Sequence, residues 1–394
     1  MPSNFIEPVI LRSWALDIPR TVFEPEHELF RRSVAAFLDR EVAPHYAQWE
    51  KDGRVSREVW RKAGEEGLLL TTMPEEYGGV GGDFRTAAII IEELAARAFA
   101  APGYTLHSEI VAPYILHYGT EEQKLQWLPK MASGEYVASI AMTEPGTGSD
   151  VQSIRTTAIR DGNELIVNGA KTFITNGELA DLVMVACKTD PDAGAKGVSL
   201  VMVETDRVGF SRGKKLEKMG EKAQDVAELF FDDVRVPPSN LLGEEGRGFA
   251  AMMDELPQER LIVVMGAVAT MEAALKWTVE YTTDRKAFGK PIISFQNTRF
   301  KLAELKTEIA IARTFADKCL ELHLEGKLDV PTAAGAKFWM TELEQKVLDT
   351  CLQFFGGYGY MMEFPIARAY TNARVHRIYA GTNEIMREIV ARSL

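Results

Sequence analysis

The chain has 394 residues, of which 46% are apolar and 26% are charged, and its formal net charge is −12. These values are typical of a soluble globular protein, and the length allows two or three units with cores of their own. The negative charge argues against nucleic acid or an anionic membrane surface as the main partner. No uncharged apolar run approaches the roughly 18 residues of a membrane span, so we expect no stable membrane insertion.

The first part of the chain, from about residue 24 to residue 135, shows helical periodicity. A glycine-rich segment, Pro74–Gly82, separates the second and third expected helices and could be a flexible hinge. The expected helices are Glu28–Val42 (with Pro44 soon after its end), one that begins at Ser56, Thr86–Ala100, Thr105–Tyr118 and Glu121–Met131.

Strand patterns replace the helical ones from residue 136 to about residue 240. The apolar run Val137–Met142 predicts a buried strand, and Asp161-Gly162-Asn163 predicts a hairpin turn. Because helical periodicity is nearly absent, we expect an all-β unit, a small barrel. Its further strands are expected at Ile154–Arg160, Glu164–Ala170, Leu182–Lys188, Val198–Glu204 and Ala227–Val234.

Long helical patterns return after residue 243 and predict a bundle. They cover Phe249–Thr283, Gln296–Glu325, Thr332–Phe355 and Thr382–Leu394. The sequence therefore predicts an α+β protein with a helical domain at 1–135, a β domain at 136–243 and a helical bundle at 244–394. Acidic residues and prolines near the N-terminus do not fit a signal peptide, so we expect a cytoplasmic protein, or a mitochondrial-matrix one in a eukaryote.

The three cysteines, Cys187, Cys319 and Cys351, are widely spaced and odd in number, which favours reduced, buried thiols. The histidines show no metal-ligand spacing, so we predict no metal site.

The loop Ala141–Asp150 follows the first expected strand and contains two glycines, a proline and several hydrogen-bonding side chains. Such a loop suits a flat, polar-edged ligand or a phosphate, although an ordinary strand–turn has the same composition. It lacks both the P-loop ending and the third glycine of a dinucleotide fingerprint.

The order of residues is more specific. Met142-Thr143-Glu144-x-x-Gly-x-Gly-Ser-Asp resembles the first signature of the acyl-CoA dehydrogenase family, and Lys171–Gly177 resembles its second flavin-contacting segment. Further matches follow in order from about Phe23 to the C-terminus. The resemblance implies the fold of that family, with an N-terminal helical domain, a middle β-barrel domain and a C-terminal four-helix bundle. It also implies bound FAD, α,β-dehydrogenation of an acyl-CoA thioester and a place in fatty acid β-oxidation.

The resemblance divides the flavin contacts into two groups. The ring end is matched by Ile140, Met142, Thr143, Gly148, Ser149, Phe173 (where a tryptophan is common), Ile174 and Thr175 (whose hydroxyl approaches flavin N5), and further flavin contacts by Thr382 and Glu384. The pyrophosphate and adenosine end is matched by Arg285, Ala287, Phe288, Phe295, Gln296, Gln353, Phe354, Gly356 and Gly357. In the family this second group comes from a neighbouring subunit, which implies a homo-oligomer, usually a tetramer. Considered without the resemblance, Phe173 and Thr175 are ordinary strand residues and Arg285 a solvated helix-end charge.

The general base is the point at which this sequence departs from the commonest family pattern. Ile378–Ile385 resembles the final family signature, in which many members carry the catalytic glutamate at the position of Ala380. Alanine cannot accept a proton. In the long-chain and isovaleryl branches the base lies at the position of Glu259, just after Pro257, which should kink its helix. Apolar neighbours there favour burial and a raised pKa.

The resemblance assigns substrate contacts to Ser149, Arg260, Ala380 and Gly381. It also implies an electron-transferring flavoprotein as electron acceptor and favours long or methyl-branched acyl chains, because Ala380 is small. Three alternatives stay open. Glu259 and Arg260 could form an exposed or structural ion pair, the protein could be an oxidase on the same scaffold, or it could be a catalytically silent acyl-CoA-binding protein.

Overall fold

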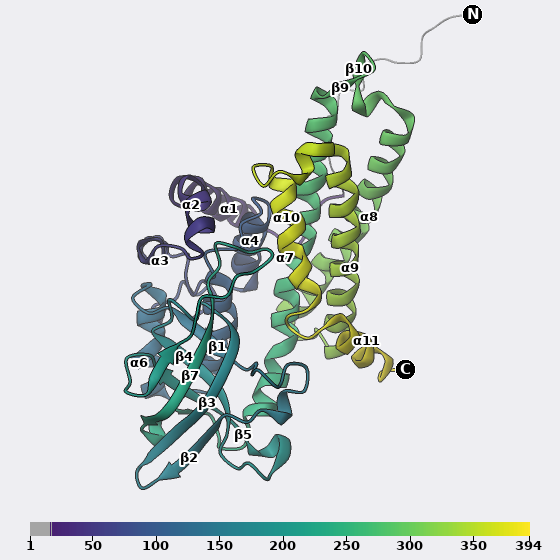
Figure 1. Cartoon of the computed structure of the whole chain (residues 1–394). Helices are drawn as coiled ribbons and strands as arrows, with labels where there is room; N and C mark the ends of the chain where they lie inside the picture. Colours follow the sequence, from purple (N-terminus) through teal and green to yellow (C-terminus); the bar gives the residue numbers. More distant parts are fainter. Residues whose placement is uncertain (1–15, 17) are drawn as a thin grey trace, which may run out of the picture.

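The computed structural model describes Leu16 and residues 18–394. Along the described chain, helices come first, strands second and helices again third, as predicted from the sequence. The long C-terminal helices lie side by side, whereas the N-terminal helices and the sheet lie together beside the first of them, α7 (Figure 1). The domain bounds at 135 and 243 stay predictions, and they fall in the connections between these groups of elements.

The N-terminal helices pack around the aromatic side chains Trp60, Trp127 and Tyr104, which are almost completely buried. Their bounds are α1 Pro25–Phe37, α2 Ala43–Asp52, α3 Arg57–Glu65, α4 Phe84–Ala95, α5 Ala112–Tyr118 and α6 Glu121–Ala132. Two π-helical turns, η1 Leu38–Val42 and η3 Leu106–Val111, lead directly into α2 and α5.

One expected helix end is confirmed and one was wrong. The first helical segment, α1 with the π-helical turn η1, ends at Val42 as predicted, and Pro44 lies in the first turn of α2, where a missing N–H costs no helical hydrogen bond. The third helix stops at Ala95 and not at Ala100, since Ala98 has a φ of 54° that an α-helix cannot contain.

The glycine-rich segment 74–82 is folded back against the chain that precedes it. The N–H of Gly81 donates to the carbonyl of Met73 at 2.9 Å, and a Cβ at Gly79 would lie 2.1 Å from the same oxygen. Close backbone packing therefore accounts for Gly79 better than a hinge does.

The middle strands form one sheet of eight, in which β4 and β5 have the predicted bounds. The β2–β3 hairpin turns where expected, with Asp161 opposite Glu164 and Gly162 at a φ of 62°. The strands are β1 Ala138–Ala141, β2 Thr157–Asp161, β3 Glu164–Thr175, β4 Leu182–Lys188, β5 Val198–Glu204, β6 Phe210–Arg212, β7 Val226–Val236 and β8 Leu241–Leu242.

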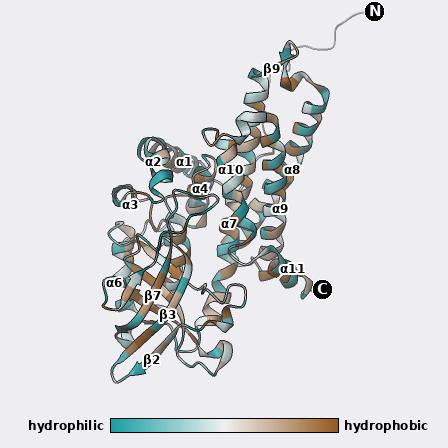
Figure 2. Ribbon diagram, viewed as in Figure 1, coloured by the Kyte–Doolittle hydropathy of each residue, from teal (hydrophilic) through white to brown (hydrophobic). Residues whose placement is uncertain are grey.

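The expected barrel is open. Hydrogen bonds give the strand order β6-β7-β3-β2-β4-β5-β8, with β1 parallel to β4, and among the described residues no ladder joins β6 to β8. In Figure 2 the strands carry long hydrophobic segments. The apolar face of the sheet forms a core of its own, centred on Val167, Val185 and Val201.

The C-terminal elements are α7 Gly248–Asp284, β9 Lys286–Ala287, β10 Lys290–Pro291, α8 Gln296–Leu324, α9 Val330–Phe355, α10 Pro365–Ala373 and α11 Asn383–Ala391. The sequence interpretation missed α10, which shares one apolar core with α7, α8 and α9 and is the fourth member of the bundle. The helix expected at Thr382–Leu394, now α11, packs on α9 outside that core. Helical structure continues on both sides of Pro257, and the predicted kink stays a prediction.

Helix α7 is the one described helix long and apolar enough to cross a membrane, but 67% of the relevant window is buried within the protein, as in a core helix. The three cysteines are buried and free, as predicted.

Candidate active site

The two segments that resemble flavin-contacting signatures form one structural unit, although they are far apart in the sequence. The N–H of Thr172 donates to the carbonyl of Thr143 at 2.9 Å. The fully buried ammonium of Lys171 donates to the carbonyl of Met142 at 2.9 Å and to the Glu144 carboxylate at 2.8 Å. The loop after β1 and the end of β3 are thus fixed relative to one another.

Glu144 completes this connection. Its carboxylate also accepts the backbone N–H groups of Arg155 at 2.7 Å and Thr156 at 2.9 Å. Burial alone would raise the pKa of Glu144, but Lys171 and the N–H donors outweigh burial and lower it. The carboxylate is therefore ionised and fully hydrogen-bonded, which is the condition under which a buried ion pair holds a defined geometry.

A β-bulge turns Phe173 away from the sheet. The register of β3 against β7 shifts between Lys171 and Ile174, and Phe173 has a φ of 60° with 67% of its surface exposed. The residue after it is buried, and the Thr175 carbonyl accepts the Ser139 hydroxyl at 2.6 Å. An exposed aromatic ring held between fixed neighbours is a suitable surface for a flat ligand.

The loop beside this ring is open to a ligand. Gly148 and Ser149 are exposed, and a Cβ added at Gly146 or Gly148 would meet no atom within 4 Å. Ile140, Met142 and Thr143 are partly buried at the start of the same loop. The residues present therefore fit a flavin ring, with an aromatic face, hydroxyl groups and free space side by side.

Glu259 lies in α7 and is 8% exposed. Its carboxylate accepts the hydroxyl of Tyr114, on α5, at 3.0 Å. Burial raises the pKa of Glu259 to about 7, with a small further rise from Glu255, while the hydrogen bond from Tyr114 and the charge of Arg260 act in the opposite direction. The alternative of an exposed glutamate in an ion pair is wrong, because Glu259 is buried and bonded to a neutral hydroxyl.

Arg260 is 3% exposed, and its Nε and Nη1 atoms have no hydrogen-bond partner among the described residues. Burial lowers the pKa of Arg260, and the neighbouring Glu259 only partly compensates. A structural arginine would have its donors paired, so these two atoms are available to a ligand.

The turn that contains Ala380 lies between the short helical segment Arg374–Arg377 and α11. Ala380 and Gly381 both have positive φ, 52° and 87°. Within the described chain, no acceptor is recorded for either backbone N–H. Lys337 of α9 binds this turn, because its ammonium donates to the Gly381 carbonyl at 2.8 Å, and the same ammonium lies near enough to Arg260 for that charge to lower the pKa of Lys337. The structure thus brings the Glu259–Arg260 turn of α7 and the Ala380 turn to the same part of α9.

The remaining residues of this signature are at the start of α11. The Thr382 hydroxyl accepts the N–H of Ile385 at 3.4 Å and caps the helix. Glu384 is exposed and lies 3.9 Å from Arg387.

The second group of predicted flavin contacts lies at the other end of the bundle. Arg285 follows α7 directly, and its guanidinium lies 5.9 Å from the centroid of the Tyr358 ring, just beyond Gly356 and Gly357. From Glu259 to Asp284, α7 spans roughly 37 Å at about 1.5 Å per residue. In Figure 1 the β9–β10 hairpin projects at the end of the bundle away from the sheet.

This second group is exposed and open. Phe288 is 96% exposed, and a Cβ at Gly289, Gly356 or Gly357 would meet nothing within 4 Å. Phe295, Gln296, Gln353 and Phe354 lie where the hairpin enters α8 and where α9 ends, and Ala287 is in β9. The structure does not bring them to the Phe173 ring within one chain, so their predicted role requires a second copy.

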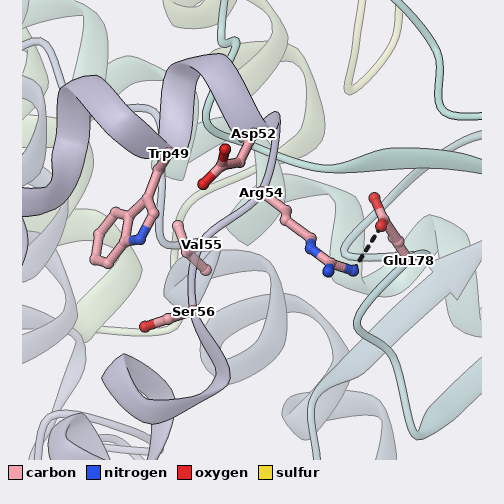
Figure 3. A pocket seen from close by; sticks show the side chains of 6 residues that line it. All are labelled: Trp49, Asp52, Arg54, Val55, Ser56 and Glu178. Atoms are coloured by element: carbon pink, nitrogen blue, oxygen red, sulfur yellow. Dashed lines mark hydrogen bonds and ion pairs between the residues drawn. The ribbon is translucent and has the colours of Figure 1, made fainter.

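The pocket drawn in Figure 3 is a different feature. It has a volume of about 420 Å³ and is lined by Trp49, Asp52, Arg54, Val55, Ser56 and Glu178. Arg54 and Glu178 form an ion pair at 2.7 Å across it. Because Arg54 and Glu178 pair with each other and no predicted site residue lines this pocket, we assign it no chemistry.

Some residues that shape the site were missed in the sequence. Tyr114 gave no signal, because a tyrosine in an amphipathic helix predicts only packing. Lys171 and Glu144 are within the two flavin signatures, but only the fold shows that they pair. Lys337, Thr341 and Glu344 were also missed, although the sequence could have indicated them, because these polar residues at i, i+4 and i+7 interrupt an otherwise apolar helix face.

Comparisons with known proteins identify the family of this chain. Models of the N-terminal, middle and C-terminal domains of acyl-CoA dehydrogenases match residues 24–135, 139–234 and 246–394. The chain is 52% identical over 377 residues to the mitochondrial long-chain specific acyl-CoA dehydrogenase of Sus scrofa, covering 95% of this chain and 88% of that protein.

Two solved structures extend the comparison. The acyl-CoA dehydrogenase of Geobacillus kaustophilus matches with a TM-score of 0.93 at 50% identity, covering 95% of this chain and 99% of that one. A glutaryl-CoA dehydrogenase of Mycobacterium smegmatis in complex with FADH2 matches with a TM-score of 0.87 at 28% identity, covering 94% and 95%. This chain therefore belongs to the acyl-CoA dehydrogenase family of FAD-dependent enzymes.

Proposed function

We propose that this protein oxidises a long-chain or methyl-branched acyl-CoA to the trans-2-enoyl-CoA, with Glu259 as the general base. The observation that carries the proposal is the buried Glu259 carboxylate, whose pKa is raised to about 7. The alternative base position, in the turn before α11, is occupied by Ala380. FAD, when bound, supplies the acceptor for the hydride that leaves the β-carbon.

Glu259 accepts the α-proton of the thioester. A base is most effective when its pKa lies near the working pH, because it is then ionised and still strong enough to take a proton. The Tyr114 hydroxyl occupies Oε1 of the carboxylate and restricts its rotation, which leaves Oε2 for the substrate proton. Glu255, one turn earlier in α7, accepts a hydrogen bond at 2.6 Å from His117 and is not free for this role.

The Ala380 turn binds the thioester oxygen. Negative charge develops on that oxygen as the α-proton leaves, and fixed N–H donors stabilise it. The backbone N–H groups of Ala380 and Gly381 have no acceptor among the described residues, and replacing a glutamate side chain by alanine does not remove them. Arg260, with two unpaired donors, provides positive charge nearby.

The cofactor is bound by two copies of the chain. Phe173, Thr143 and Thr175 would hold the ring of the bound cofactor, and the Lys171–Glu144 ion pair keeps their segments in register. Arg285 of a neighbouring copy would bind the pyrophosphate, and Gly356 and Gly357 would let backbone approach it closely. We therefore propose a homo-oligomer, a tetramer, and an electron-transferring flavoprotein as the electron acceptor.

Anaerobic mixing of the purified yellow protein with saturated acyl-CoAs of increasing chain length tests the proposal. We expect the flavin absorption to bleach, fastest with long or methyl-branched chains. A protein that binds acyl-CoA without bleaching would be the silent acyl-CoA-binding protein and would overturn the proposal. Rapid reoxidation by air with peroxide formation would instead identify an oxidase.

A further inference from the structure

We propose that Lys337 is a positioning residue, which holds the Ala380–Gly381 turn so that its N–H groups face the thioester oxygen. This inference rests on the proposed function, because it assigns the N–H groups of that turn to the substrate. Lys337 itself lies in α9 and contacts no reacting atom.

The inference begins with a stripe of polar residues in the core. Lys337, Thr341 and Glu344 occupy positions i, i+4 and i+7 of α9, so they share one face of the helix, and all three are 0% exposed. Burying an ammonium and a carboxylate in a helix core is unfavourable unless their hydrogen bonds are made. The bonds that they make lead to the segment between His376 and Asn383.

Lys337 binds the carboxyl side of the turn. Its ammonium donates to the Gly381 carbonyl at 2.8 Å and to the Asn383 side-chain oxygen at 3.1 Å. Asn383 in turn donates to the Thr341 hydroxyl at 2.9 Å. Two residues of α9, Lys337 and Thr341, therefore hold the turn and Asn383, the first residue of α11.

Glu344 binds the amino side of the turn through His376. The His376 ring nitrogen Nδ1 lies 2.8 Å from the Glu344 carboxylate, and the His376 ring stacks on Tyr379 at 5.4 Å. The backbone of residues 380 and 381 is therefore held from both sides by one helix face.

The conformation between these two attachments requires such restraint. Ala380 has a φ of 52°, a region that residues with a Cβ rarely adopt unless surrounding structure imposes it. A Cβ at Gly381 would lie 2.6 Å from the Met386 side chain, so this position also depends on close packing. Among the described residues neither backbone N–H of this turn has an acceptor, so both donors are available to a ligand.

Among the described residues, no ion pair with a carboxylate accounts for the burial of Lys337. Burial and, to a smaller extent, the charge of Arg260 lower the pKa of Lys337 to about 8, against weaker opposite effects of Glu384 and Glu342. In the described chain no carboxylate lies within ion-pair distance of its ammonium. Its two hydrogen bonds to the turn are its recorded polar contacts.

The test replaces Lys337 by methionine, which keeps the apolar length of the side chain and removes its donors. The turn would then be free to leave its positive-φ conformation. Because the thioester oxygen needs its donors most when it carries charge, we expect the rate constant of flavin reduction to fall about 10- to 100-fold with little change in KM. The matched control is Lys346→Met, an exposed lysine of α9 paired with Glu308 at 2.6 Å, which should reduce flavin at the unaltered rate.

Two further readouts separate positioning from general stability. The carbonyl stretch of a bound enoyl-CoA should move toward its value in water in Lys337→Met, since the N–H donors no longer polarise it. Adding Ala380→Gly to Lys337→Met should recover part of the rate, because glycine adopts positive φ without steric penalty. If Lys337→Met does not fold, Lys337→Gln, which retains a donor of shorter reach, takes its place in both measurements.

An unchanged rate and carbonyl stretch in a folded Lys337 variant, with an active parent enzyme, would overturn the inference. So would a double variant that is as slow as the single one. An inactive parent enzyme would be a failure of the proposed function, which is a different result.

Discussion

Two of the groups of buried charges in the described part of the chain differ in how far their hydrogen bonds are satisfied. In the first, Arg313 donates to Glu92 at 2.7 Å and to Glu272 at 2.8 and 2.6 Å, while Arg20 donates to both Glu92 and Asp317. In the second, Arg260 has two donor atoms without partners and Glu259 has one neutral partner.

The direction of the pKa shifts follows this difference. Burial tends to raise the pKa of Glu92, but Arg313, Arg20 and Arg31 outweigh it and hold that pKa well below its usual range. Burial dominates at Glu259 and raises its pKa. Paired charges stabilise a geometry, whereas unpaired ones remain available to a ligand or a proton. The first group therefore links α4, α7, α8 and the segment before α1, and the second is the place for chemistry.

The largest effect is expected at Glu259. Replacing it by glutamine keeps shape and a hydrogen-bond acceptor but removes the base, so flavin reduction should slow by about 10²–10⁴, while FAD and acyl-CoA still bind. Stopped-flow reduction measures this. Glu255→Gln is the matched control, being a buried carboxyl one turn away, and should have a much smaller effect.

The same variant tests where a base can act. Adding Ala380→Glu to Glu259→Gln places a carboxylate in the turn before α11, and we expect partial recovery of reduction with an altered chain preference. If the Glu259→Gln single variant reduced flavin at the unaltered rate, Glu259 would not be the general base.

The second effect concerns stability and not rate. Glu92→Gln removes the buried carboxylate that Arg313 and Arg20 share, so these cations keep only Glu272 and Asp317 as partners among the described residues, which should lower the free energy of unfolding by about 3–5 kcal/mol. Denaturant titration measures this, and the reduction rate per bound flavin should not change. Glu93→Gln, a less buried neighbour bonded to Arg97 at 2.7 Å, is the control with an expected loss of about 1 kcal/mol. If Glu92→Gln and Glu93→Gln lowered the free energy of unfolding equally, the stabilising role assigned to the buried Glu92 group would be contradicted.

A third prediction concerns an arginine outside both groups. Arg285 is exposed, and its proposed partner is the pyrophosphate bound by a neighbouring copy. Arg285→Ala should weaken flavin retention about 10- to 100-fold, the usual effect of losing a charged hydrogen bond, without loss of helix content. Flavin release during dilution, followed by fluorescence, measures it, and full flavin occupancy in a demonstrated monomer would contradict the shared site.

The smallest expected effect is a pH shift in Tyr114→Phe. Glu259 must be ionised to accept a proton, so the reduction rate falls as the pH drops through its raised pKa of about 7. The Tyr114 hydrogen bond lowers that pKa, and losing a bond of about 1 kcal/mol should move the acid limb upward by up to about one pH unit. Reduction rates between pH 5.5 and 9 measure the shift, and a shift to lower pH would contradict the role of Tyr114.

The sequence predicted those features that depend on neighbouring residues. Strands β4 and β5 are continuous apolar runs with clear ends, and the Gly162 turn has its own local signal. Strand order depends on pairing between distant segments, so the open sheet could not be foreseen. Helix α10 was missed because it has only nine residues, so its buried apolar positions extend over too few turns to be distinguished from a loop in the sequence.

The candidate site divides in the same way. Apolar neighbours of Glu259 predicted its burial, but its partner Tyr114 is 145 residues away in the sequence. The unpaired donors of Arg260 are a property of the packed structure alone. Residue types do not show whether a buried charged group has all its hydrogen-bond partners, because that depends on which distant groups the fold brings within hydrogen-bond distance.

The central claim, that Glu259 takes the α-proton, is tested most directly by proton exchange without oxidation. A 3-thia-acyl-CoA has an acidic α-proton but does not complete the hydride transfer, so exchange of that proton with deuterated solvent reports the base alone. We predict rapid exchange in the unaltered enzyme and in Glu255→Gln, and exchange slower by about two orders of magnitude or more in Glu259→Gln. Exchange at the unaltered rate in Glu259→Gln would contradict the account and require another base.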